Sequence, residues 1–248
     1  MLEILSFVIG ALFGSFANVI ILRLPKNQNI VFPRSYCFKC QKQIAWYFNI
    51  PIFSYLMLQG KTACCKKRLN PQYIIVEALM GLLFLLNHLY FNIFQTITLN
   101  ILFFITILII FIDFNEKIIF DIFNYSILIS GLLISLLFNH LNPIDISIKN
   151  SIITALIGIS LFYILRLFFL KFRNIEALGL GDIYLIAGFG SWLGFEKFLY
   201  LLIISSLLGI IYFIIFMIIL FSGKIIDIKF TALKFDTIVF KRGSKAER

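Results

Sequence analysis

The sequence predicts an all-α polytopic membrane protein with about seven transmembrane helices and a small cysteine-containing loop subdomain between the first two. Of its 248 residues, 61% are hydrophobic and 14% are charged, whereas soluble domains average about 45–50% and 25%. The mean hydropathy is +0.99, and apolar runs near the roughly 20 residues that cross a bilayer follow one another along the chain. These observations exclude an ordinary soluble enzyme and a disordered chain.

Seven apolar runs are the candidate spans. The first has no basic start, is too long for the core of a signal peptide and ends near Arg23, so we expect an uncleaved helix. The sixth is short and contains glycine, which predicts either a tilted, broken helix or a re-entrant one. The runs are Leu2–Leu24, Tyr73–Phe91, Ile97–Ile112, Ile122–Phe138, Ser151–Leu170, Ile183–Gly194 and Phe198–Phe221.

Lysine and arginine set the expected orientation. With the N-terminus outside and seven spans, 20 of the 22 basic residues fall on the inside, and only Lys149 and Lys197 fall outside. Because cytoplasmic loops collect basic residues, this distribution favours a sixth run that crosses fully. The net charge of +10 therefore reflects topology, so we expect the lipid bilayer as a partner and no nucleic acid. The basic tail at 223–248 is either solvated or lies on anionic lipid.

Two aspartates lie at the inside ends of spans, where a charged group is a functional candidate because it is costly near hydrocarbon. Asp113 follows the third run, and Asp182 opens the sixth within Gly179-Leu180-Gly181-Asp182. Two carboxylates held a few ångströms apart tend to share a proton, so one can activate water while the other protonates a carbonyl oxygen. The glycines would let a substrate backbone approach. The pattern predicts an aspartyl hydrolase.

Structural roles are the alternative for these acids. Asp113 can be a helix-end residue and Asp182 an N-cap preceded by a turn. Asp121 and Glu116 are rivals for the pair, and Glu77 is interpreted as a residue near the headgroup end of the second span.

Several short motifs along the chain form a recognisable set. They are Phe13-Gly14-Ser15-Phe16-Ala17-Asn18-Val19, Arg23-Leu24-Pro25, Cys37-Phe38-Lys39-Cys40, Trp46-Tyr47-Phe48-Asn49-Ile50-Pro51, Ile112-Asp113 with Asp121, and Gly179-Leu180-Gly181-Asp182. Together they resemble the type IV prepilin peptidases, bacterial leader peptidases that process prepilins and pseudopilins. The resemblance implies an aspartyl protease that cuts a short basic leader at the cytoplasmic face of the inner membrane, with Asp113 and Asp182 as its catalytic residues and no cofactor for proteolysis.

A second activity is implied by the same resemblance. Many members N-methylate the new terminus with S-adenosylmethionine, and the matching residues here are Gly14, Ser15, Asn18 and Arg23.

The sequence also departs from the family pattern. Phe120 stands where proline is usual, Tyr184 stands where lysine is usual, and the eighth span is missing or replaced by the tail. Any positive charge beside the aspartates must therefore come from elsewhere.

Four cysteines resemble a split zinc knuckle in a reducing compartment. Cys37 and Cys40 form a C-x-x-C pair, whereas Cys64 and Cys65 are adjacent and Thr62 stands where the third cysteine is expected. Neighbouring cysteines reach one tetrahedral ion less easily than a spaced pair, so the sequence leaves a structural zinc open. Cys65 is the better match to the motif and Cys64 a displaced ligand, while a disulfide is disfavoured on the cytoplasmic side.

The leading hypothesis divides the chain into a first helix (1–24), a loop subdomain (25–71) that holds the zinc knuckle and part of a methyltransferase, a peptidase core (72–222) and the basic tail (223–248). The alternative is a proton- or cation-coupled transporter that uses Asp113 and Asp182, although a transport site should lie near the midplane. A membrane scaffold with a zinc-bound loop leaves Gly179–Asp182 unexplained.

Overall fold

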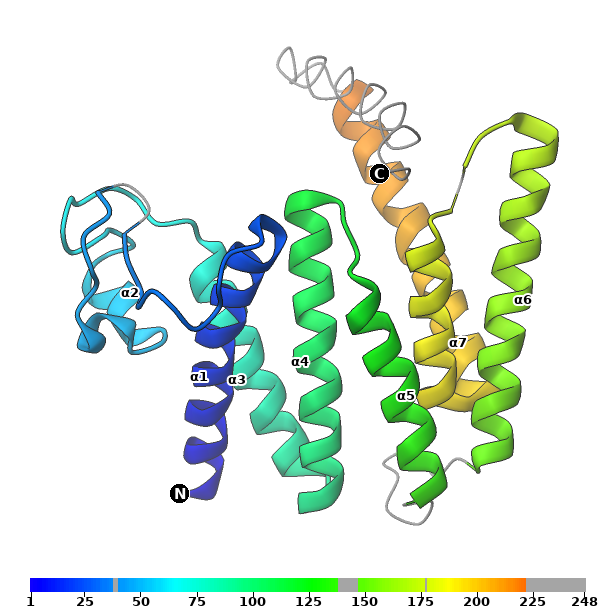
Figure 1. Cartoon of the computed structure of the whole chain (residues 1–248), viewed down its shortest axis with the longest axis horizontal. Helices are drawn as coiled ribbons and strands as arrows, with labels where there is room; N and C mark the ends of the chain where they lie inside the picture. The colour runs from blue at the N-terminus through cyan, green and yellow to red at the C-terminus, as the bar shows by residue number, and fades with distance from the viewer. Residues whose placement is uncertain (38–39, 138–146, 177, 222–248) are drawn as a thin grey trace. The chain divides into compact units, whose positions relative to one another are not determined.

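The computed structural model describes residues 1–37, 40–137, 147–176 and 178–221, which form helices and no strand (Figure 1). The chain divides into two compact units, Met1–Ile148 and Lys149–Arg248. The prediction of an all-α fold is confirmed. The helices are α1 (Leu2–Arg23), α2 (Phe53–Met57), α3 (Gln72–Tyr90), α4 (Ile93–Glu116), α5 (Asp121–Leu137), α6 (Ile148–Arg173) and α7 (Leu180–Phe221), with short 3-10 turns at Leu24–Lys26 and Trp46–Asn49.

Five of these helices, α1, α3, α4, α6 and α7, are long and apolar enough to cross a membrane, and α5 is a shorter apolar helix. The described parts of the seven predicted runs lie on helices except for Phe91 at the end of the second run, but the sixth and seventh runs share α7. Gly194 interrupts α7 with φ 66° and ψ 173°, a conformation that glycine adopts without steric cost. Figure 1 shows the two arms of α7 running in different directions on either side of this break.

Helix ends differ from the ends of the apolar runs, because caps rather than hydropathy decide where a helix begins and ends. The side chain of Asn92 accepts the Gln95 N–H in a capping box, so α4 begins at Ile93 rather than Ile97. It continues past Asp113 to Glu116, which puts that aspartate in the last turn of the helix. Phe138 and the tail at 223–248 lie outside the described residues.

The core of the first unit lies where α1, α3 and α4 meet. Two glycines of α1 face α3 directly. A Cβ on Gly10 would lie 2.6 Å from the Met80 carbonyl oxygen, and one on Gly14 would lie 2.7 Å from the Glu77 Cα. This G-x-x-x-G spacing allows the two backbones to pack closely, as in other membrane helix pairs. The buried apolar side chains around the contact are Ala17, Ile20, Ile21, Val76, Met80, Phe84, Ile107, Leu108 and Ile112.

We expect Gly10→Leu to lower the thermal unfolding temperature of the detergent-solubilised protein, because the new side chain would clash with backbone and Cβ atoms of α3. Overpacking of this kind costs about 1–3 kcal/mol. Gly209→Leu in α7 is the matched control, since a Cβ there meets no atom within 4 Å. Equal unfolding temperatures for the two variants would contradict close packing of α1 on α3.

One end of the first unit gathers the features that matter for function. The segment between α1 and α3 lies at this end (Figure 1). The Asn115 side-chain nitrogen donates to the Gln72 side-chain oxygen at 3.1 Å, which joins the last turn of α4 to the first turn of α3. Asp113 therefore lies at the same end of the unit as the cysteine-containing loop.

In the second unit, α6 packs against the first arm of α7. A Cβ on Gly190 would lie 3.2 Å from the Thr154 carbonyl oxygen, so this contact is also a close backbone approach. The Phe195 N–H, just after the break in α7, donates to the Asn150 side-chain oxygen at 3.3 Å. This bond supplies an acceptor for an N–H at the interruption of the helix.

Candidate functional site

Two turns in the loop between α1 and α3, at 36–43 and 61–68, share one hydrogen-bonding pattern. The first residue of each pattern is Cys37 or Thr62. Its N–H donates to the carbonyl oxygen of the residue five positions later, and its own carbonyl oxygen accepts the N–H of the residue four positions later. All four hydrogen bonds are 2.8–3.0 Å long. In each, the residue after the last cysteine, Gln41 or Lys66, has a positive φ of 59° or 52°. Thr62 thus occupies the position in the second turn that Cys37 holds in the first.

The four cysteine sulfurs form one cluster, in which all Sγ atoms lie within 4.8 Å of one another. Cys40 and Cys64 have sulfurs 3.0 Å apart, and those of Cys37 and Cys65 are 3.8 Å apart. A tetrahedral zinc with bonds of about 2.3 Å separates its sulfur ligands by about 3.8 Å. The Cys37–Cys65 separation equals this value, whereas the Cys40–Cys64 separation is shorter. The adjacent Cys64 and Cys65 both reach the cluster, so the four cysteines could hold a single metal ion.

Hydrogen bonds in and around the cluster shift the pKa values of two thiols in opposite directions. Hydrogen bonding to Cys40 raises the pKa of Cys64 to about 12. The pKa of Cys65 is lowered, chiefly by the Thr62 side chain, whose oxygen lies 3.1 Å from the Cys65 sulfur, and next by the Lys67 N–H. Since a metal cation deprotonates the thiols that bind it, the free cluster and a metal-bound one would differ in charge.

Asp113 and Asp182 lie on helix ends, one in each unit. Asp113 is partly buried in the last turn of α4, whereas its rivals Glu116 and Asp121 are exposed. Asp182 is partly buried in the first turn of α7, and one of its carboxylate oxygens accepts the Gly179 N–H at 3.1 Å. A Cβ on Gly179 would lie 3.1 Å from that oxygen, so the glycine leaves room for the carboxylate. The pairing of the two aspartates stays a prediction.

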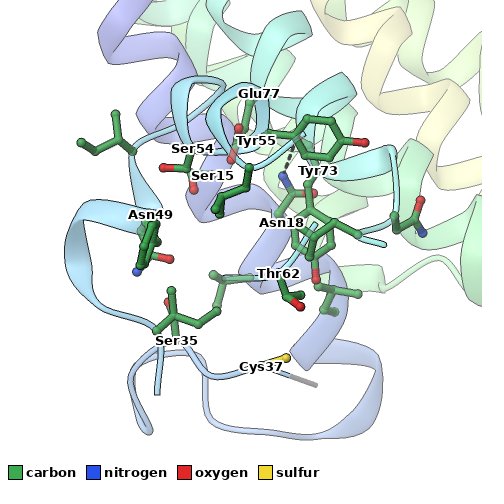
Figure 2. Close-up of a pocket in the computed structure, with 18 of the residues that line it drawn as sticks. Ser15, Asn18, Ser35, Cys37, Asn49, Ser54, Tyr55, Thr62, Tyr73 and Glu77 are labelled. Atoms are coloured by element: carbon green, nitrogen blue, oxygen red, sulfur yellow. Dashed lines mark hydrogen bonds between the residues drawn. The ribbon is translucent and has the colours of Figure 1, made fainter. Parts of the chain in front are cut away.

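A cavity of about 750 Å³ lies between α1, α3 and the loop (Figure 2). Three residues of the amino-terminal motif, Ser15, Asn18 and Arg23, line it. The motif's Gly14 packs against α3 beside it. Cys37 from the first cysteine turn and Thr62 from the second also contribute to the wall. The cavity therefore connects the amino-terminal motif to the cysteine cluster.

The buried residues of the motif have different partners. The guanidinium of Arg23, 5% exposed, donates to the carbonyls of Asn29 and Ile30 at 3.1 Å each and lies over the Tyr36 ring. This arginine fixes the start of the loop. The side-chain nitrogen of Asn18 donates to the Tyr73 carbonyl at 3.1 Å, but its side-chain oxygen is buried without a partner.

Glu77 is the cavity residue that sequence reasoning missed. It is 8% exposed, and its carboxylate accepts the Ile52 N–H at 2.7 Å. In Figure 2 it lies at one end of the cavity and Cys37 at the other. An acid inside an apolar run is itself a functional signal; its position near the end of the run led to its interpretation as a headgroup residue.

Two protein-family models match the chain. The Bacterial Peptidase A24 N-terminal domain matches residues 8–91, and the Type IV leader peptidase family matches residues 100–214. The prepilin leader peptidase/N-methyltransferase of Klebsiella pneumoniae is 32% identical over 81% of this chain and 89% of its own length.

The chain belongs to the type IV leader peptidase family. A protein of the same name from Vibrio cholerae is 30% identical over 84% of each chain. The type 4 prepilin-like proteins leader peptide-processing enzyme of Escherichia coli is 30% identical over 86% of this chain and 85% of its own length. No solved structure matches.

The two matches cover different candidate site residues of this leader peptidase family member. The amino-terminal match covers the cavity and the cysteine cluster, and the second match covers both Asp113 and Asp182. The family is one of aspartic peptidases, and with its apolar helices the protein is a multi-pass membrane protein. This favours the peptidase interpretation over the transporter.

Proposed function

We propose that this protein is an aspartic endopeptidase of the bacterial inner membrane that removes the short basic leader of prepilins or pseudopilins at the cytoplasmic face. The match of residues 100–214 to the leader peptidase family, which includes both aspartates, carries the proposal. The names of the relatives support the substrate class. The excess of basic residues on the expected inside supports the orientation.

In the proposed mechanism, Asp113 and Asp182 act as a pair on the peptide bond. The ionised carboxylate draws a proton from water while the protonated one donates to the carbonyl oxygen of the peptide bond. The Gly179 N–H, which donates to Asp182, orients that carboxylate at the start of α7. The lack of a side chain at Gly179 and Gly181 gives an extended substrate backbone access to it. Proteolysis needs no cofactor in this scheme.

We also propose that the four cysteines hold a structural zinc. The donor set and the 3.8 Å between the Cys37 and Cys65 sulfurs fit a tetrahedral thiolate site, and the 3.0 Å between the Cys40 and Cys64 sulfurs would widen on binding. Such an ion would hold the two cysteine turns together. Since Cys37 and Thr62 belong to the cavity wall, it would also fix the shape of the cavity.

A second proposed activity is methylation of the newly exposed amino terminus. The match of residues 8–91 to the amino-terminal family domain and the names of the relatives support it. S-adenosylmethionine would supply the methyl group. The cavity beside Ser15, Asn18 and Arg23 has a volume and an unpartnered buried polar atom, the Asn18 side-chain oxygen, that fit such a cofactor.

The test of the proposed function is reconstitution of the full-length protein in lipid vesicles with a prepilin-type substrate: a short basic leader, glycine and an apolar helix. We expect mass spectrometry to show cleavage directly after the glycine, without added metal or nucleotide. With S-adenosylmethionine present, the mature product should also carry a methyl group on its amino terminus. An uncut substrate, together with proton or cation uptake that depends on Asp113, would instead favour the transporter.

A further inference from the structure

A buried carboxylate without a cationic partner lines the cavity of the first unit. Glu77 is 8% exposed, and no lysine, arginine or histidine among the described residues forms an ion pair with it. A buried carboxyl group ionises readily only when its charge is paired or coordinated. Ser15 and the Ile52 N–H, its neighbours in the structure, carry no positive charge. No cation of the described residues therefore pairs with this group, and a positively charged ligand would stabilise its ionised form.

Anchoring the loop does not require an acid at this position. Ile52 has φ 62°, a strained conformation for a β-branched residue, and its N–H donates to the Glu77 carboxylate. This bond holds the loop where α2 begins. It requires only an oxygen acceptor, which the neutral amide of a glutamine would supply with the same reach.

A second acceptor that lines the cavity has no hydrogen-bond donor. Asn18 is 2% exposed, and its side-chain nitrogen, bonded to the Tyr73 carbonyl, fixes the amide so that the oxygen has no donor. Tyr73 and Glu77 are four residues apart on α3, which is about one helical turn, or roughly 5.4 Å. The cavity thus presents a carboxylate and an amide oxygen near each other. Because buried acceptors are normally hydrogen-bonded, the Asn18 oxygen requires a donor from a ligand. The Glu77 carboxyl group beside it favours a ligand that also carries a positive charge.

We propose that this cavity is the binding site of S-adenosylmethionine, with Glu77 facing the positively charged part of the ligand and the Asn18 side-chain oxygen accepting one of its N–H groups. The proposal rests on the proposed methyl transfer. The volume of about 750 Å³ lies within the roughly 300–1,000 Å³ of small-molecule sites. Arg68, which lines the same cavity and is exposed, can pair with the carboxylate of the ligand.

The position of the cavity agrees with this assignment. It lies at the end of the first unit where Asn115 joins α4 to α3, and this is also the end that carries Asp113. Cleavage at Asp113 would release the free amine on the side of the protein that holds the methyl donor.

The experiment measures the affinity of the full-length protein in detergent for S-adenosylmethionine and for 5′-methylthioadenosine, a neutral thioether that keeps the adenosine and lacks every charged group of the donor. We expect the wild type to bind S-adenosylmethionine more tightly. Glu77→Gln should lower that affinity by about 30-fold or more, the equivalent of a lost buried charge pair. Its affinity for 5′-methylthioadenosine should be unchanged, which shows that the cavity is intact.

Glu196→Gln is the matched control, since Glu196 is an exposed acid on α7; it should bind both ligands as the wild type does. Equal affinities of the wild type for the two ligands would overturn the proposal without the use of any variant. Unchanged S-adenosylmethionine binding by Glu77→Gln would overturn it while methyl transfer itself stands. A wild type that cleaves prepilin but neither binds nor uses the donor would overturn the proposal and the proposed methylation together, and leave the peptidase standing.

Discussion

Asp113→Asn and Asp182→Asn should each reduce cleavage of a prepilin-type substrate by about four orders of magnitude, the scale seen when one catalytic group is removed from a protease. Asparagine keeps the size of aspartate but can neither accept a proton from water nor donate one to a carbonyl oxygen. Because both carboxylates serve in the same step, the double variant should be no slower than either single variant. Initial cleavage rates in lipid vesicles, followed by gel shift and mass spectrometry, measure the effect.

Asp121→Asn is the control for this prediction, since Asp121 is an exposed acid at the start of α5, close in sequence to Asp113. It should cleave at the wild-type rate. Cleavage retained in both Asp113→Asn and Asp182→Asn would contradict the aspartyl mechanism. Cleavage lost in Asp121→Asn but retained in Asp113→Asn would move the first catalytic position to α5.

Cys64→Ser should reduce bound zinc from about one equivalent to nearly none. The Cys64 sulfur lies 3.0 Å from that of Cys40, while Thr62 stands at the position that a cysteine would hold in the second turn. Loss of an outer-shell partner lowers metal affinity by roughly 10–100-fold. Removal of a direct ligand should lower the affinity further. Metal analysis of protein purified without chelators measures the amount of bound zinc. We also expect a lower unfolding temperature, because the ion joins two turns of the loop.

The double variant Thr62→Cys/Cys64→Ala should restore zinc, because the two turns share one hydrogen-bonding pattern and the new cysteine would match Cys37. Ala63→Ser, an exposed neighbour, is the control and should keep the metal. Full zinc in Cys64→Ser would show that Cys64 is not a ligand. Less than about a tenth of an equivalent in the wild type would exclude the structural zinc.

Much of the fold could be predicted because the bilayer makes strict demands on sequence. Spanning helices must be apolar over their length, since no water satisfies polar groups in the hydrocarbon. The number and order of the apolar segments were therefore visible in the composition of the chain. The junction of the last two at Gly194 was not, because a short run with a glycine predicts either a tilted, broken helix or a re-entrant one, and the charge distribution favoured a run that crosses fully without showing where it joins the next.

The sequence alone predicted the aspartates of the candidate site but not the helix contact beside the cavity. Asp113 and Asp182 are conspicuous in a chain that is poor in acids, and the family match includes both. Gly14 entered the prediction only as part of a motif. The structure supplies its physical role, since α1 and α3 approach so closely there that no side chain fits. Its partner Gly10 was missed because glycine spacing acquires meaning only once the facing helix is known.

The sequence by itself determined that this protein is helical, membrane-embedded and a member of an aspartic peptidase family, because apolar length, charge sidedness and short motifs are properties of the chain alone. Only the tertiary structure decided which residues share a cavity. Glu77 and Asn18 belong to different helices, and their burial arises from the packing of α1 on α3 under the loop, which also leaves the Asn18 side-chain oxygen without a partner. The same holds for Cys64, whose place in the cluster depends on how two distant turns fold against each other.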